Sequence, residues 1–183
     1  MKQGGPLDAQ LKRLRLLLTA GSGGVGKTTM AATLALRAAN LGRKVVVLTI
    51  DPAQRLAQAM GLTGITGELT QVTLPREGEG EVTGELWAMM LDIKTTSDRM
   101  VERFAPSQAA CRDILENDYY RYFSTVLAGT QEYMAIEQVR RLMEDEQFDL
   151  VVLDTPPATH ALDFLDAPDR LIDGLSSLPV KAL

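Results

Sequence analysis

The residues with the clearest chemical potential lie in the stretch GSGGVGKTT, residues 21–29. Gly21, Gly26, Lys27 and Thr28 satisfy the spacing G-x-x-x-x-G-K-[ST] of a phosphate-binding loop. Glycines allow backbone angles closed to other residues, so that successive N–H groups can converge on one phosphate. Lys27 would neutralise the outer phosphates of a nucleotide, and the Thr28 hydroxyl would bind Mg²⁺. The pattern therefore predicts a site for a nucleotide and Mg²⁺ formed by Gly21, Ser22, Gly23, Gly24, Val25, Gly26, Lys27, Thr28 and Thr29.

Two aspartates follow apolar segments and are candidates for the chemistry at those phosphates. Asp51 comes directly after KVVVLTI, and Asp154 comes after LVVL. Because phosphoryl transfer depends mostly on positioning and charge stabilisation, one aspartate can reach the metal and another can orient the attacking water. Either aspartate could instead cap the helix that follows its strand. Since the phosphate loop is present, we favour function: the candidate metal ligands are Thr28, Asp51 and Asp154, and the candidate catalytic residues are Lys27 and Asp51.

Strands and helices are predicted to alternate, and this alternation positions all three motifs. Apolar segments at residues 14–19, 44–50, 86–92 and 148–154 are typical of buried strands. Helical spacing follows the glycine loop, and it predominates again from residue 95 to residue 147. The fold class is therefore α/β, a doubly wound and mostly parallel sheet with flanking helices. Ligands of such sheets bind at the carboxyl ends of the strands, which is where the three motifs begin.

Length and composition indicate one domain with a hydrophobic core, since the chain has 183 residues of which 45% are hydrophobic. Residues 1–10 contain Gly4, Gly5 and Pro6 and are predicted to form a flexible tail, before a domain over residues 11–183. The net charge of −5 argues against a nucleic-acid partner. One cysteine, Cys111, excludes an internal disulfide and fits a reducing, cytoplasmic compartment. No apolar run approaches the roughly 20 residues of a membrane span.

These motifs resemble those of one family of dimeric ATPases. GGVGKTT is similar to the phosphate loop of a P-loop NTPase group that includes ParA/MinD-type positioning proteins, nitrogenase iron protein, and the arsenite-pump or tail-anchored-protein-targeting ATPases. TIDPAQRLAQAMGL and LDTPPATHALDFL resemble switch I and switch II of the last of these, the ArsA-type family. LAGTQEYMAI resembles a further segment of that family, with Glu132 at the matching acid. The resemblance extends from Leu14 to Leu171, and bacterial anion-transporting ATPases are the most similar members.

The resemblance implies an ATP-hydrolysing dimer, formed with itself or with a homologous ATPase, whose switch loops couple the nucleotide state to a membrane-protein client or membrane subunit. The Walker A loop would span residues 21–29, switch I residues 51–56 and switch II residues 154–162, with a helical insert at about residues 95–147. Asp51 would orient the hydrolytic water, and Asp154 would contact Mg²⁺ through water. The switch II residues would be Asp154, Thr155, Pro156, Pro157 and His160. For the lone His160, a structural or relay role is favoured over metal binding.

Three features depart from the family pattern. Ser22 replaces the signature lysine that reaches across the dimer, and loss of such a cation can slow hydrolysis by several orders of magnitude. Arg55 could substitute for that lysine, or it could be only a solvated helix charge. Metalloid binding needs several soft thiolates, which Cys111 alone cannot supply. Because the family's sheet extends beyond the strands found here, we expect the C-terminal part of the fold to be absent and the first strand to lie at an open edge.

Three functions stay open on the sequence alone. The favoured one is a Mg²⁺-dependent ATPase of the ArsA type that drives or regulates a membrane-associated transport, targeting or stress process. A ParA/MinD-type positioning ATPase would need a DNA- or membrane-binding segment, and the sequence shows no basic stripe or amphipathic tail. A nucleotide-binding regulatory subunit with little hydrolysis would fit Ser22. ATP turnover, measured alone and with candidate partners, would separate these functions.

Overall fold

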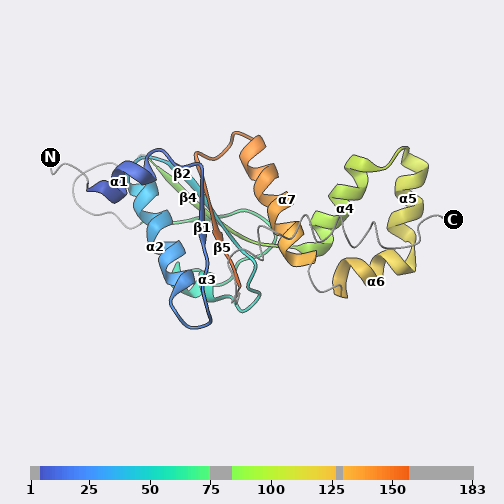
Figure 1. Ribbon diagram of the computed structural model, residues 1–183, viewed down its shortest axis with the longest axis horizontal. Helices are drawn as coiled ribbons and strands as arrows, with labels where there is room; N and C mark the ends of the chain where they lie inside the picture. The colour runs from blue at the N-terminus through green and yellow to red at the C-terminus, as the bar shows by residue number, and fades with distance from the viewer. Residues whose placement is uncertain (1–4, 75–83, 127–129, 157–183) are drawn as a thin grey trace.

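The centre of the computed structural model, which describes residues 5–74, 84–126 and 130–156, is a five-stranded sheet (Figure 1). The order across the sheet is β1-β5-β2-β4-β3, and every neighbouring pair is parallel except β3 with β4. The strands are β1 (Leu16–Thr19), β2 (Lys44–Thr49), β3 (Thr70–Val72), β4 (Glu85–Met90) and β5 (Leu150–Asp154). The predicted α/β class with a mostly parallel sheet is therefore confirmed. The sequence missed β3, a three-residue strand at the far edge of the sheet, because it is too short to show an alternating pattern.

Helices cover both faces of the sheet because its central strands are apolar on both sides. Val45 and Val47 of β2 pack into the cluster that contains the buried face of α2, whereas Val46 and Leu48 pack into the cluster of α7. Figure 1 shows α2 and α7 on opposite sides of the strands. The helices are α1 (Pro6–Leu11), α2 (Lys27–Asn40), α3 (Arg55–Ala59), α4 (Ile93–Phe104), α5 (Gln108–Glu116), α6 (Asp118–Val126) and α7 (Thr130–Glu144).

Helix α2 lies close to the sheet because its inner face is built from alanine. Ala31, Ala35 and Ala38 are fully buried at helical spacing, and they pack against the apolar residues of β2 and β5. A small side chain lets the helix backbone approach the strands, so the N-terminus of α2 is held firmly at the carboxyl end of β1. This close packing fixes the place of the glycine loop that precedes the helix.

The N-terminal segment differs from the flexible tail expected over residues 1–10. Residues Pro6–Leu11 form α1, which has proline in its first turn and a fully buried Leu11. Asp8 is buried against α2, and both of its carboxylate oxygens accept hydrogen bonds from Arg37, at 2.8 and 2.6 Å. These bonds are the main reason that the pKa of Asp8 lies below its usual range. The prediction failed because the contact that orders this segment is made with a residue far along the chain.

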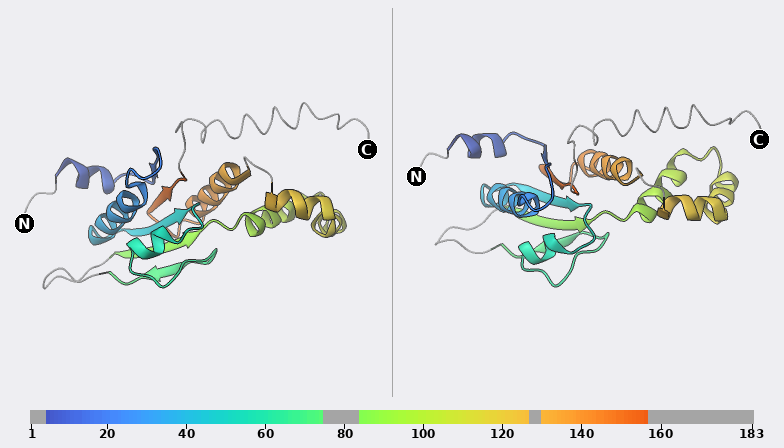
Figure 2. Two further views of the ribbon diagram at one scale, coloured as in Figure 1. Left: turned by 90° about the horizontal axis from the view of Figure 1, so that it is seen from below. Right: turned by 60° about the horizontal axis from the view of Figure 1, so that its bottom comes forward.

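The described residues of the predicted helical insert form α4, α5, α6 and α7, of which α4 packs against α7 beside the sheet (Figure 1). Helices α5 and α6 pack on α4 and on each other, and they extend away from the sheet in both views of Figure 2. Two side-chain caps mark helix starts: Asp92 accepts from the backbone of Thr95, and Ser107 accepts from that of Ala110. Helix α4 follows β4 almost directly, so the insert is joined to the sheet at the carboxyl edge.

Strand β1 lies at an edge of the sheet, as expected from the sequence. In the described residues it pairs with β5 alone, and Leu16 is 40% exposed. The strand was predicted to be buried, but this holds only for its last residue, Thr19. An edge strand presents unpaired backbone groups on one side, which is a surface that a further strand can use.

We expect Gly84→Ala to destabilise the fold strongly. A Cβ atom at Gly84 would lie 2.0 Å from the backbone oxygen of Ala39 and 2.6 Å from that of Arg43, where α2 ends and β2 begins. Backbone atoms cannot rotate away as a side chain can, so the substitution should lower the free energy of unfolding by about 2–3 kcal/mol. Urea unfolding followed by far-ultraviolet circular dichroism would measure this change.

Gly64→Ala is the matched control for this prediction. A Cβ at Gly64 would meet only the Gln54 Oε1, at the ordinary contact distance of 3.8 Å. We expect this variant to unfold within about 0.5 kcal/mol of the parent. Equal stability of the two alanine variants would contradict the steric argument at Gly84.

Candidate functional site

The three predicted motifs meet at the carboxyl edge of the parallel strands. In the sheet register, Thr19 of β1, Asp154 of β5 and Thr49 of β2 lie side by side as the last residues of their strands. The glycine loop follows β1 directly, and Asp51 follows β2 by two residues. Parallel pairing thus brings together residues that are more than one hundred positions apart in the chain.

Asp154 is the centre of a hydrogen-bond cluster formed with three threonines. Its Oδ2 accepts from the hydroxyls of Thr28, at 2.8 Å, and Thr49, at 3.3 Å, while its Oδ1 accepts from that of Thr19, at 3.4 Å. Asp154 is only 1% exposed. Burial is the main reason that its pKa is raised, the nearby charge of Asp51 adds to that effect, and the threonine hydroxyls oppose it. A buried carboxylate of this kind favours an added positive charge beside Thr28.

The glycine loop exposes backbone N–H groups at the start of α2. Gly24 and Gly26 have φ angles of 78° and 88°, in the left-handed region that favours glycine. Across the described part of the chain, the N–H groups of residues 22–26 have no hydrogen-bond acceptor. The helix dipole adds a partial positive charge at the same place. Lys27 reaches back over the loop, and its Nζ donates to the Ser22 carbonyl at 2.9 Å. These donors together form a cradle suited to a phosphate.

Asp51 lies next to this cluster, and Thr49 connects it to Asp154. The Thr49 hydroxyl donates to Asp154, and its oxygen accepts from the Asp51 N–H at 3.2 Å. The Asp51 carboxylate accepts from the Ala53 N–H at 2.9 Å, and it forms an ion pair with Arg55 one helical turn later. The exposed Arg55 therefore contacts the candidate catalytic carboxylate of its own chain.

The structure describes only some of the remaining predicted residues. Thr155 lies beside the cluster, where its hydroxyl donates to the Thr19 carbonyl at 2.7 Å. Pro156 is the last residue before a stretch that lies outside the described residues, so Pro157 and His160 are not placed. Glu132 lies in the first turn of α7, where its Oε2 is buried without a hydrogen-bond partner in the described part of the chain. Among the described residues, no hydrogen bond or ion pair joins Glu132 to the glycine loop.

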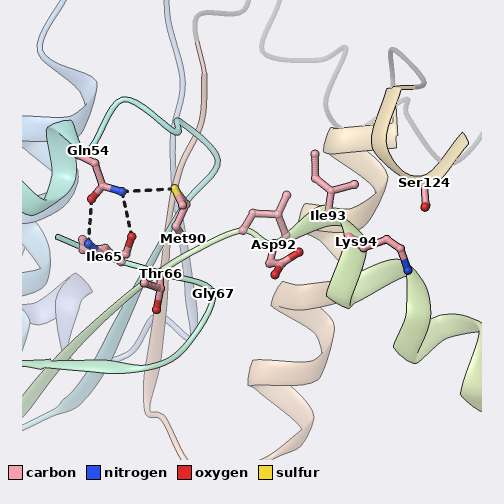
Figure 3. A pocket seen from close by; sticks show the side chains of 10 residues that line it. Gln54, Ile65, Thr66, Gly67, Met90, Asp92, Ile93, Lys94 and Ser124 are labelled. Carbon is pink, nitrogen blue, oxygen red and sulfur yellow. Dashed lines mark hydrogen bonds between the residues drawn. The ribbon is translucent and has the colours of Figure 1, made fainter. Parts of the chain in front are cut away.

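Sequence reasoning missed Gln54, which anchors the end of the Asp51 loop. Gln54 has a φ angle of 55°, and its side-chain amide bonds both backbone groups of Ile65, at 2.8 and 2.9 Å (Figure 3). A cavity of about 490 Å³ opens beside it, between residues 65–67 and the start of α4. The sequence carries no signal for this anchor. Thr19 and Thr49 differ in this respect. Each is a polar residue at the end of an apolar segment, and that pattern in the sequence could have pointed to them.

The residues present fit a magnesium ion held together with nucleotide phosphates. In the described ranges no cluster of three or more His, Cys, Asp or Glu side chains could hold a metal alone. Mg²⁺ does not require such a cluster, because it commonly uses one or two protein oxygens, several waters and the substrate's phosphates. The Thr28 hydroxyl and the Asp154 carboxylate are hard oxygen donors of this type, and they already lie within 2.8 Å of each other.

The parallel sheet, the glycine loop at the start of α2 and the aspartate clusters at the carboxyl edge define the fold class of P-loop NTPases. The model of the family described as "Anion-transporting ATPase" matches residues 14–180, and the chain belongs to this ArsA-type family. The resemblance read from the sequence motifs is thereby confirmed.

Several relatives of this chain are named as ATPases. The chain is 28% identical over 165 residues to "ATPase ASNA1 homolog" of Dictyostelium discoideum, covering 90% of this chain and 45% of the relative. It is 28% identical over 167 residues to "ATPase GET3" of Malassezia globosa, with coverages of 90% and 46%. It is 27% identical over 180 residues to "ATPase BagA" of Mycobacterium tuberculosis, with coverages of 95% and 52%.

The chain spans about half the length of the curated relatives that it matches. Among the described residues, no helix is both long and apolar enough to cross a membrane.

Proposed function

We propose that the protein containing this chain binds ATP with Mg²⁺ in the Gly21–Thr29 loop and hydrolyses it. The observation that supports this proposal best is the bond between Thr28 and the buried Asp154, beside a loop whose N–H groups have no acceptor in the described residues. An ordinary helix start has no need for a buried carboxylate next to its first turn. Membership of the family of anion-transporting ATPases supports the same reaction.

Each side chain would have a distinct part in the reaction. The loop N–H groups and the Lys27 ammonium would bind the phosphate oxygens and stabilise the charge that develops on them. Thr28 and Asp154 would hold Mg²⁺, which would neutralise part of the charge of the phosphates. Asp51 would accept a hydrogen bond from the attacking water and so orient it. For this the Asp51–Arg55 ion pair must open, because that carboxylate is engaged with Arg55 and with the Ala53 N–H.

The proposal includes a nucleotide-dependent dimer, formed with a second copy or with a homologous ATPase, and a membrane-protein client or subunit. The family resemblance supports this part, and the position of Asp51 agrees with it. The loop that carries Asp51 is anchored by Gln54 to residue 65, and residue 67 contacts Asp92 at the start of α4. A movement of that loop could therefore be passed to the helical insert. A cytoplasmic location stays a prediction from the cysteine content.

A nucleotide-binding subunit with little hydrolysis is a second candidate, and it also rests on specific observations. Ser22 stands where family members carry a lysine, and the Asp51 carboxylate is paired with Arg55. The family match favours either of these functions over a ParA/MinD-type positioning role.

Phosphate release by the parent protein separates the two candidates, and Asp51→Asn tests the role given to Asp51. For the purified full-length protein, we expect Mg²⁺-dependent phosphate release from ATP, falling about 100-fold in Asp51→Asn because water is no longer oriented by a carboxylate. Binding of a fluorescent ATP analogue should change little. A phosphate-release assay with and without a candidate membrane partner measures turnover.

Asp113→Asn is the matched control, because Asp113 is an exposed aspartate of α5, in the insert rather than at the site. It should retain the parent rate. ATP binding without turnover under every partner condition would contradict the ATPase proposal and support the regulatory subunit.

A further inference from the structure

The seam between α4 and α7, where the two helices pack together in Figure 1, encloses a cavity of about 110 Å³. Two buried polar side chains line it, Thr96 from α4 and Gln138 from α7, which are 4% and 2% exposed. Within the described residues, the Thr96 hydroxyl has no hydrogen-bond partner, and the Gln138 amide nitrogen reaches only the Met89 sulfur, at 3.6 Å. Among the described residues neither of these donors is a fully buried atom without a partner, so both stay accessible from the cavity and can donate to a ligand there.

The walls of the same cavity carry an excess of positive charge. Four arginines and two glutamates line it, and both carboxylates are already used. Arg140 bonds Glu137 through two nitrogens, at 2.6 and 2.7 Å, and it also pairs with Glu144. Arg103 lies at 3.9 Å from each of these two glutamates.

The remaining two arginines of the cavity wall, Arg99 and Arg141, are exposed side chains whose charges lie close enough to act on each other. In the described part of the chain, neither Arg99 of α4 nor Arg141 of α7 forms an ion pair or a hydrogen bond. Burial lowers the pKa of Arg141 and the positive charge of Arg99 lowers it further, whereas the nearby carboxylates of Asp145 and Glu137 act in the opposite direction. The two like charges disfavour each other, and an anion bound between them would remove this repulsion.

We propose that the α4–α7 cavity is a binding site for one tetrahedral oxyanion of the phosphate type. Arg99 and Arg141 supply the charge, and Thr96 and Gln138 supply neutral donors from the buried side. A phosphate presents oxygens in several directions, which suits donors that come from two helices. The site is separate from the glycine loop, since it lies between two helices of the insert.

The size of the cavity restricts the ligand to a small anion. Drug-sized ligands occupy pockets of about 300–1,000 Å³, so a volume of about 110 Å³ does not admit a nucleotide. An occupied site would join α4, which starts at the end of β4, to α7, which precedes β5. The bound anion would therefore stiffen the contact between the helical insert and the sheet.

The test is a titration of the full-length protein with inorganic phosphate, followed by calorimetry at constant ionic strength with chloride as the replacement anion. Every protein in the series also carries Lys27→Ala. This substitution weakens phosphate binding at the glycine loop to the same extent in all of them. We expect the double variant Arg99→Gln with Arg141→Gln to bind phosphate about 100-fold more weakly, or about tenfold for each lost charged hydrogen bond. Thr96→Val should weaken binding by severalfold.

Arg112→Gln is the matched control, because Arg112 is an exposed arginine of α5 that lies outside the cavity. It should leave the phosphate affinity unchanged. An equal loss of phosphate affinity in this control would show a general charge effect and would overturn the proposal, as would unchanged affinity in the double variant.

A second experiment uses vesicles of phosphatidylcholine with phosphatidic acid. Binding to those vesicles that depends on Arg99 and Arg141, with no binding of free phosphate, would overturn the proposal in favour of a lipid headgroup.

Discussion

Asp154→Asn is expected to abolish ATP turnover while leaving the fold at least as stable as that of the parent. The Asp154 carboxylate is 1% exposed, and its pKa is raised mainly by burial, so its charged form is costly in the folded protein. Asparagine has nearly the same shape and no charge, so at neutral pH the substitution removes this cost. The threonine hydroxyls can rotate to donate to, or accept from, the new amide.

Turnover should nonetheless fall by about 1,000-fold or more, because the neutral amide no longer favours Mg²⁺ beside Thr28. Thermal unfolding without nucleotide and phosphate release with Mg²⁺ and ATP are the two measurements. Asp145→Asn, at an exposed aspartate after α7, is the control and should change neither result. A lower unfolding temperature in Asp154→Asn would show that the carboxylate stabilises the fold, which would contradict the cost assigned to its burial.

Lys27→Ala is expected to remove most of the ATP affinity with little effect on folding. The Lys27 Nζ forms one hydrogen bond, to the Ser22 carbonyl, and the side chain is only partly buried. Its loss therefore removes little from the structure. In a nucleotide complex the same ammonium would face the outer phosphates, where it has no replacement, since Ser22 has no charge and Arg55 is paired with Asp51.

We expect kcat/KM for ATP hydrolysis to fall by about 1,000-fold in Lys27→Ala, with the unfolding temperature unchanged. Equilibrium binding of a fluorescent ATP analogue would locate the loss in binding rather than in the chemical step alone. Lys12→Ala, at an exposed lysine just after α1, should bind ATP as the parent does. ATP affinity equal to that of the parent in Lys27→Ala would overturn the assignment of the glycine loop.

The glycine loop, the apolar strands and the fold class were predictable because they depend on local sequence. Glycines at fixed spacing determine the backbone of the loop, and an apolar run as long as KVVVLT has few alternatives to a buried strand. The two aspartates were found in the same way, since each comes at the end of an apolar segment of the sequence. The family match agrees with these local motifs over residues 14–180.

The contacts that only the tertiary structure reveals join distant parts of the chain. Helix α1 is ordered by the bonds between Asp8 and Arg37, although its own sequence reads as a tail. Strand β3 forms because β4 provides an edge for it, and Gln54 anchors its loop through the backbone of Ile65. None of these contacts has a signature in neighbouring residues.

The sequence by itself determined which residues could hold phosphate and metal, because a phosphate loop is a local arrangement of backbone and one lysine. The tertiary structure decided what surrounds them, since the parallel register places Thr19 and Thr49 on either side of Asp154 and α2 brings Thr28 to it across 126 positions of sequence. Burial is a property of that assembly and not of any segment. The structure alone therefore shows why the charged form of the Asp154 carboxylate is disfavoured without a cation.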